Sequence, residues 1–126
     1  MRALIPIAAA ALIAGCSRPV MPPGSGFAEA VAGRVAGAPQ ICIPVTPAEN
    51  LHAVDAQTIA YGFGRTIFIN RLASPCPGLG ETNTIIVEAN PGNRYCRGDR
   101  VRGLETGAII PGPSCNLGDW VPYRLP

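Results

Sequence analysis

The sequence predicts an all-β fold, a small disulfide-stapled antiparallel meander or closed barrel of about six strands. Three observations support this prediction. Short runs rich in β-branched and aromatic residues recur along the chain, and 15 glycines and 14 prolines punctuate it. Helix signals are almost absent after Gly37. Four cysteines follow residue 40, as expected for a domain too small to be stabilised by its core alone.

Period-2 counting places the strands. Ile59, Tyr61 and Phe63 share one predicted face, and Ile85 and Val87 share another. The predicted strands cover residues 40–45, 58–63, 66–72, 84–89, 94–97 and 100–104, with closing β segments at 108–110, 115–117 and 120–125.

Glycine and proline also predict the connections. Residues 62–65 suit a tight connection because glycine adopts positive φ, and the Asn-Pro-Gly-Asn stretch at 90–93 suits a type II turn. Thr46 as N-cap and Pro47 at the first helical position predict one helical turn.

Residues 1–15 predict a lipoprotein signal peptide. Arg2 precedes an apolar run at 3–14, which is too short for a bilayer span of about 20 residues. The sequence IAGC at 13–16 resembles the lipobox of bacterial lipoproteins, which implies that Cys16 is lipidated. The alternative is an ordinary signal peptide with a chance cysteine at its end.

Residues 16–40 are expected to form a flexible tether, and residues 41–126 the four-cysteine β domain. The stretch SRPVMPPGSG is rich in proline, glycine and serine. Phe27, Val31 and Val35 have helical spacing, but the segment is short and predicts a frayed helix or more linker. Ser17, in place of aspartate after the lipobox cysteine, implies an outer-membrane location with the domain facing the periplasm.

Cys42, Cys76, Cys96 and Cys115 are expected to form two disulfides, since an even number of cysteines in a small exported domain indicates a disulfide framework. Three connectivities are open. We favour Cys76–Cys96 with Cys42–Cys115, because the second pair would join the first and last strands of a closed sheet. A metal site is disfavoured, because the chain has no Cys-x-x-Cys and its single histidine is His52.

The segment YCRGDRVRG at 95–103 contains an Arg-Gly-Asp tripeptide. Arg94, Arg97, Arg100 and Arg102 are candidate contacts for an anion such as a phosphate or a lipopolysaccharide, and solvated arginines beside an edge strand are the favoured alternative. Cell adhesion is disfavoured, because a disulfide at Cys96 would hold the segment against the domain. A net charge of +2 does not suggest nucleic-acid binding.

Hydrolytic chemistry has few candidates. His52 and Asp55 are close in sequence, and Ser74 and Ser114 are potential nucleophiles. Both serines neighbour a proline and a cysteine, which favours turns. No catalytic residue, cofactor or metal is therefore assigned.

The cysteine motifs resemble those of an uncharacterised family of small exported proteobacterial proteins, a domain of unknown function. The motifs are NRLASPCPGL (70–79), YCRGDRV (95–101) and SCNLGDWVP (114–122). The resemblance covers about residues 41–122. It implies a four-cysteine fold and brings no catalytic residues.

The expected function is that of a non-enzymatic outer-membrane lipoprotein. Its expected partners are the membrane, through the lipid anchor, and another envelope protein or an anionic envelope component. One alternative is a lysozyme inhibitor that plugs a glycosidase cleft with a projecting loop at 74–82 or 106–114, by analogy at the level of the fold. A small periplasmic hydrolase centred on His52 is the second alternative.

Overall fold

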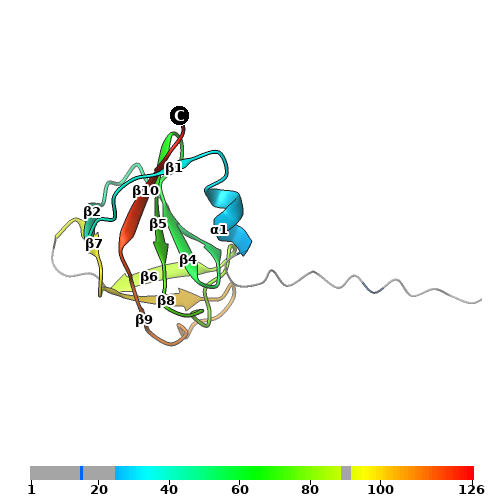
Figure 1. Ribbon diagram of the computed structural model, residues 1–126. Coiled ribbons are helices and arrows are strands. Elements are labelled where there is room, and N and C mark those ends of the chain that lie inside the picture. Colours follow the sequence, from blue (N-terminus) through cyan, green and yellow to red (C-terminus); the bar gives the residue numbers. More distant parts are fainter. Residues whose placement is uncertain (1–14, 16–24, 89–91) are drawn as a thin grey trace, which may run out of the picture.

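A computed structural model describes residues 15, 25–88 and 92–126 (Figure 1). These residues form an all-β fold with one short helix, which confirms the predicted class. The elements are α1 (Ser25–Ala30), β1 (Val35–Ala36), β2 (Cys42–Pro44), β3 (Leu51–Asp55), β4 (Thr58–Tyr61), β5 (Thr66–Arg71), β6 (Thr84–Glu88), β7 (Arg94–Cys96), β8 (Arg100–Leu104), β9 (Cys115–Asn116) and β10 (Trp120–Arg124).

The strands form two sheets and a ribbon, and every described ladder is antiparallel. The larger sheet has the order β1-β10-β5-β4-β3, the smaller has the order β6-β8-β9, and β2 pairs with β7. Figure 1 shows β6 and β8 running across the lower end of the larger sheet. Within the described residues, β3 and β6 each end a sheet, so these ladders do not close into one hydrogen-bonded ring.

The main core lies where the two sheets and the ribbon meet. Ile43 from β2, Ile59 from β4, Val101 from β8 and Trp120 from β10 are each 0% exposed and belong to one apolar cluster. Burying a side chain of this size contributes about 1.5–3 kcal/mol. One core therefore holds together strands of both sheets and of the ribbon.

The opposite face of β4 and β5 is also buried. Ala60, Ile67 and Ile69 pack against Phe27 and Val31 of the N-terminal segment. Because alternate side chains of a strand point to opposite faces, burial on both faces requires a layer on each side. The helix α1 supplies that second layer.

Two features let α1 pack closely on β3. A Cβ atom at Gly26 would lie 1.9 Å from the carbonyl oxygen of Val54, so only glycine permits this approach. The buried carboxylate of Asp55 accepts a hydrogen bond from the Phe27 amide at 3.0 Å, which satisfies a backbone donor in the first turn of the helix. The Arg71 guanidinium lies 4.2 Å from the centre of the Phe27 ring.

Residues 25–40 therefore belong to the folded domain, so the predicted tether of 16–40 is too long. Val35 of β1 pairs with Arg124 of β10, and Gln40 forms a bridge with Trp120. A six-residue helix is marginal in isolation, and packing rather than local propensity stabilises it here. All the described helices, strands, core clusters and disulfides lie within 25–126.

Three local predictions differ from the structure. Strand β3 was not predicted, because Leu-His-Ala-Val-Asp lacks clear alternation and contains a bulge between Ala53 and Asp55. Phe63 does not share a face with Ile59 and Tyr61, because β4 ends first and Gly62, with φ of 87°, turns the chain outward. The segment 108–110, predicted as strand, is an exposed loop.

Two predicted connections have different outcomes. The chain does turn after Thr46, where the Glu49 amide donates to the Thr46 carbonyl at 3.3 Å, but no helix forms. The turn predicted at 90–93 lies partly outside the described residues.

The four domain cysteines form two disulfides as predicted, but the favoured pairing is wrong. Cys42 is bonded to Cys96, and Cys76 to Cys115. Cys42 and Cys96 sit opposite each other in the β2–β7 ladder, with Cα atoms 4.0 Å apart. The first cysteine strand thus pairs with β7 rather than with a strand near the C-terminus.

Candidate functional site

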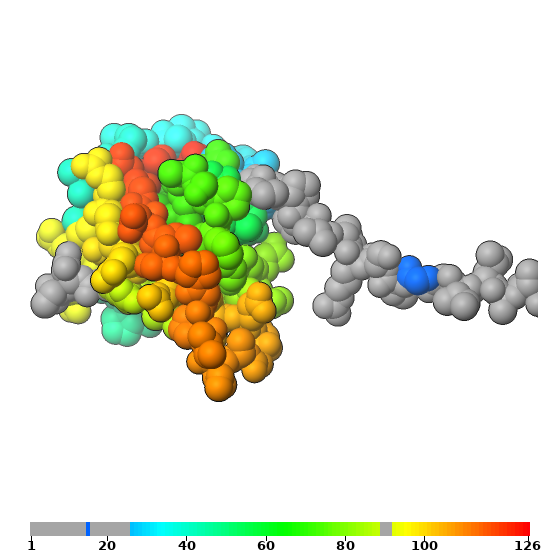
Figure 2. All heavy atoms as spheres, turned by 90° about the horizontal axis from the view of Figure 1, so that it is seen from below, coloured from blue at the N-terminus to red at the C-terminus, as the bar shows by residue number. Residues whose placement is uncertain are grey.

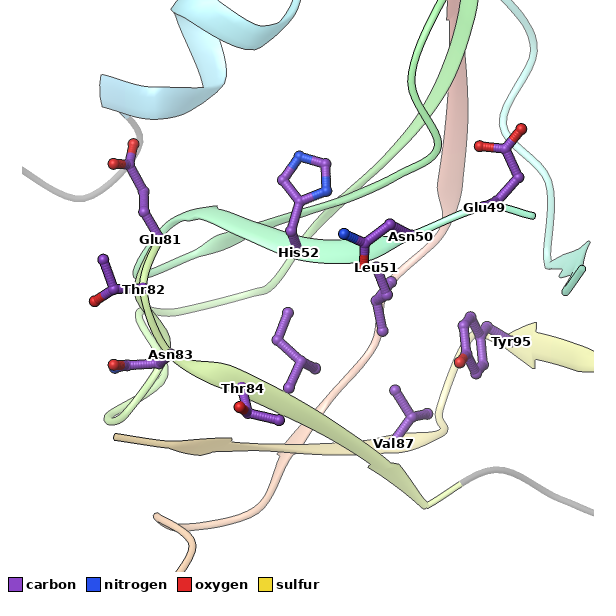
Figure 3. Close-up of a pocket in the computed structure, with 11 residues that line it drawn as sticks. Glu49, Asn50, Leu51, His52, Glu81, Thr82, Asn83, Thr84, Val87 and Tyr95 are labelled. Atoms are coloured by element: carbon purple, nitrogen blue, oxygen red, sulfur yellow. The ribbon is translucent and has the colours of Figure 1, made fainter. Parts of the chain in front are cut away.

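A cavity of about 580 Å³ lies between β3 and β6, and we name it the β3–β6 groove (Figure 3). Apolar or aromatic side chains form its floor, and polar side chains form its rim. The floor residues are Leu51, Ile85, Val87 and Tyr95. The rim residues are Glu49, Asn50, His52, Glu81, Thr82, Asn83 and Thr84.

The floor is continuous with the protein core. Leu51, Ile85, Val87 and Tyr95 are partly buried and pack against the main core cluster. Leu51 comes from β3, whereas Ile85 and Val87 come from β6, so the floor joins the two sheets. Figure 3 shows Leu51 and Val87 pointing into the space between the two strands. A ligand in the groove would cover the part of this apolar surface that is still exposed.

Tyr95 forms a rigid wall at one end of the groove. Its ring packs edge-to-face on Tyr61, with the centroids 6.0 Å apart and an interplanar angle of 88°. The Tyr61 hydroxyl accepts a hydrogen bond from the Thr46 amide at 2.8 Å, which holds the pair in place. Burial raises the pKa of Tyr95 above its ordinary value of 10.0, and Tyr61 raises it further. The Tyr95 phenol is therefore uncharged at neutral pH and can donate a hydrogen bond.

The two strands that border the groove each present an unpaired edge. Strand β3 ends the five-stranded sheet and β6 ends the three-stranded sheet, and no hydrogen bond joins them in the described part of the chain. An edge strand leaves a row of N–H and C=O groups available to another backbone. In Figure 3 the two strands run in opposite directions and diverge towards Tyr95.

The charge of the rim is negative. Glu49 and Glu81 lie towards opposite ends of the groove, and its described lining contains no arginine (Figure 3). The Glu49 carboxylate accepts one hydrogen bond, from the Phe63 amide at 3.3 Å. The exposed Glu81 lies in the turn that leads into β6. The groove therefore complements a cationic group better than an anionic one.

The residues of the hydrolase hypothesis are not assembled. The His52 ring stacks on Phe63, with the centroids 4.8 Å apart, and Figure 3 shows it directed away from the apolar floor. Asp55 uses both carboxylate oxygens to accept backbone amides, those of Phe27 and Gln57. Within the described residues, no hydrogen bond joins His52 to a serine or a carboxylate, and its buried Nδ1 atom has no partner.

The two candidate serines lie in other positions. Ser74 and Ser114 are exposed and flank the Cys76–Cys115 disulfide, and neither lines the groove.

Three of the four arginines proposed as anion contacts form ion pairs. Arg100 and Arg102 both contact the carboxylate of Glu88, at 3.2 Å and 3.5 Å. Arg97 contacts Asp119 at 3.0 Å. Glu88 lies directly opposite Arg100 in the β6–β8 ladder, so sheet register creates this cluster. Exposed pairs of this kind contribute about 0–1 kcal/mol each. They reduce the positive charge available to an anion, although Arg100 and Arg102 share one carboxylate.

The Arg-Gly-Asp tripeptide forms a turn rather than a presented loop. Gly98 has φ of 89°, and the Asp99 side chain points inward with a residue exposure of only 6%. Its carboxylate accepts the Cys96 amide at 2.8 Å. Arg94 is exposed on β7, which belongs to a different ladder from β8. The structure therefore does not bring the four guanidinium groups together into one site.

The loop at 106–114, one of the two loops that could serve the inhibitor alternative, projects from the domain. Figure 2 shows this orange segment extending from the body of the domain. The Cys76–Cys115 disulfide ties its base to the loop at 74–82. A Cβ atom at Gly103 would lie 1.9 Å from the Gly78 carbonyl oxygen, so the two backbones touch below the loop. Its tip presents two aliphatic side chains, Ile109 and Ile110, which are 92% and 78% exposed.

No protein-family model, curated protein or solved structure matches the chain. Within residues 25–88 and 92–126, no cluster of histidine, cysteine or acidic side chains could hold a metal ion, and no helix has the length and hydropathy to cross a membrane. Cys16 and its apolar leader lie outside the described residues, so lipidation stays a prediction.

Sequence reasoning missed the groove because it missed β3. The shared face of Ile85 and Val87 was visible in the sequence, but the strand that faces them was not. The two rim glutamates carry no sequence motif.

Proposed function

We propose that this protein is a non-enzymatic, lipid-anchored binding protein of the outer membrane, and that its domain faces the periplasm and holds another envelope component in the β3–β6 groove. The lipobox-like sequence before Cys16 supports the anchor, and the two disulfides suit an oxidising compartment. The observation that carries the binding role is the groove itself, with an apolar floor and an acidic rim between two strand edges that no described strand pairs.

The chemistry of the groove favours a protein partner over an anionic envelope component. Its two rim carboxylates would repel phosphate or sulfate groups. The arginines suited to such groups lie outside the groove lining, and three of them are paired with acids.

Site-specific photo-crosslinking in intact cells tests this function. A benzophenone side chain at Thr84, an exposed residue of the groove rim, is expected to form a discrete adduct with an envelope component. The matched control is Asn116, which is exposed on β9 and outside the groove. Equal adducts from both positions, or none from Thr84, would refute the groove as the site that holds an envelope component in the cell.

The lysozyme-inhibitor alternative draws support from the projecting, disulfide-braced loop at 106–114. Its tip chemistry fits less well, because glycosidase clefts carry a pair of carboxyl groups whereas the tip presents Ile109 and Ile110. An inhibition assay with residues 17–126 tests this alternative directly. Inhibition that is lost in Ile109→Ser/Ile110→Ser would support it, and no inhibition at micromolar protein would remove it.

A further inference from the structure

We propose that the occupant of the β3–β6 groove is an extended polypeptide segment that carries a lysine or arginine side chain and adds as a strand to the free edge of β6. This inference rests on the proposed binding function and names the chemistry of the partner. The unpaired edge, the floor and the charge of the rim each support it.

The edge of β6 is the more accessible of the two. Gly26 of α1 approaches the Val54 carbonyl of β3, so the helix covers the end of that strand. By contrast, β6 pairs with β8 on one side, and no described backbone group pairs with its other side from Thr84 to Glu88. Every second residue of such a strand points its N–H and C=O outward. The best complement to this row is another extended backbone, since a small molecule rarely offers donors and acceptors at the strand repeat.

The floor of the groove suits the side chains of an added strand. Alternate side chains of an extended peptide point to the same face, so those that face inward would lie over Leu51, Ile85 and Val87. Tyr95 closes one end of this surface and offers a neutral phenol as a hydrogen-bond donor. The floor therefore favours apolar residues at alternate positions of the bound segment.

The rim sets the charge of the remaining positions. Glu81 and Glu49 lie towards the two ends of the groove, so a segment that runs along β6 passes at least one carboxylate (Figure 3). Glu88, at the end of β6, is already paired with Arg100 and Arg102. The uncompensated negative charge is therefore at the rim glutamates, and it selects a cationic side chain.

A peptide library tests both parts of the inference. The non-lipidated chain 17–126, exported and oxidised, is mixed with a library of seven-residue peptides. These peptides carry valine at alternate positions and a random mixture of amino acids at the other positions. We expect at least ten-fold enrichment of lysine or arginine over aspartate or glutamate in the retained peptides. Enrichment of acidic residues, or no enrichment, would overturn the charge assignment.

Backbone addition is tested with the best retained peptide. Methylation of alternate amide nitrogens keeps every side chain of the peptide but removes backbone hydrogen-bond donors. Methylation of the amides that face β6 is expected to weaken binding at least ten-fold. Bound peptide should also slow amide hydrogen exchange in residues 84–88. Two observations would overturn strand addition: equal affinity of the peptides methylated on either edge, or unchanged exchange in β6.

A matched pair of variants tests which acidic residue contacts the cationic side chain of the peptide. Glu81→Gln is expected to weaken the cationic peptide about two- to five-fold, as expected for a partly exposed ion pair. Glu105→Gln, which removes an exposed acid outside the groove, should leave affinity unchanged. Equal effects of the two variants would show that the peptide responds only to net charge, which refutes the proposed site.

These experiments separate the inference from the proposed function. Thr84 crosslinks in cells without peptide selection would leave the binding role intact and refute the peptide partner. Peptide selection without Thr84 crosslinks would refute the envelope role instead. Concentration-dependent protection of residues 84–88 without peptide would identify a second copy of the chain as the partner and overturn the inference.

Discussion

Removal of the Cys42–Cys96 disulfide should cost this domain much of its stability. The two cysteines are separated by 54 positions, and in the chain-entropy model a crosslink over a loop of this length stabilises the fold by about 4 kcal/mol. Small native proteins have a total free energy of unfolding of about 5–15 kcal/mol. Cys42→Ala/Cys96→Ala should therefore lower the free energy of unfolding by about 4 kcal/mol. This loss corresponds to a melting temperature that is lower by roughly 15–30 °C.

The assay is equilibrium unfolding in guanidinium, which measures the free energy of unfolding. The comparison variant is Cys76→Ala/Cys115→Ala. The second disulfide spans 39 positions, so its entropic contribution is also about 4 kcal/mol. Cys76 is only 1% exposed and lies in the main core, so its replacement adds a packing loss that the half-buried Cys42 and Cys96 lack. We expect the second variant to be the less stable one. A loss below about 1 kcal/mol for Cys42→Ala/Cys96→Ala would refute the loop-entropy reasoning.

The disulfide connectivity has a direct test. Arginines separate the four cysteines in the sequence, so each cysteine lies in its own tryptic peptide. Digestion without reduction should give peptide 35–65 joined to 95–97, and peptide 72–94 joined to 103–124. Any other joined pair would contradict the connectivity.

Three further predictions concern the anchor, the Arg-Gly-Asp turn and the groove wall. Cys16→Ser should move the protein from the membrane to the soluble fraction and abolish palmitate labelling; an unchanged distribution would contradict lipidation. Asp99→Ala should lower the free energy of unfolding by about 1–3 kcal/mol, because the Cys96 amide loses its acceptor, whereas Glu105→Ala, at an exposed acid, should change it by less than about 0.5 kcal/mol in the same denaturation assay. The raised pKa of Tyr95 means that the folded state holds its phenolic proton more tightly than the unfolded state, so this contribution to stability is complete below pH 10.0 and is lost as pH rises towards the folded-state value. Urea midpoints between pH 8 and pH 11 should fall less steeply in Tyr95→Phe than in the parent, and parallel slopes would show that another group causes the loss.

The sequence by itself determined the class of fold and many of its strands. The runs that became β4, β5, β8 and β10 could be predicted because period-2 side-chain alternation and the glycine and proline breaks between strands are local properties. The even cysteine count predicted two disulfides. These inferences depend on composition or on residues close together in the chain.

Only the tertiary structure decided which strands meet, and this set both the disulfide partners and the groove. Cys42 bonds Cys96 because β2 lies against β7, a contact between residues far apart in sequence. The short helix α1 is stable because it packs on Val54 and the second apolar layer, which no propensity within six residues reveals. The groove exists because β3 and β6 end separate sheets, and an unpaired edge is a property of the whole packing rather than of either strand.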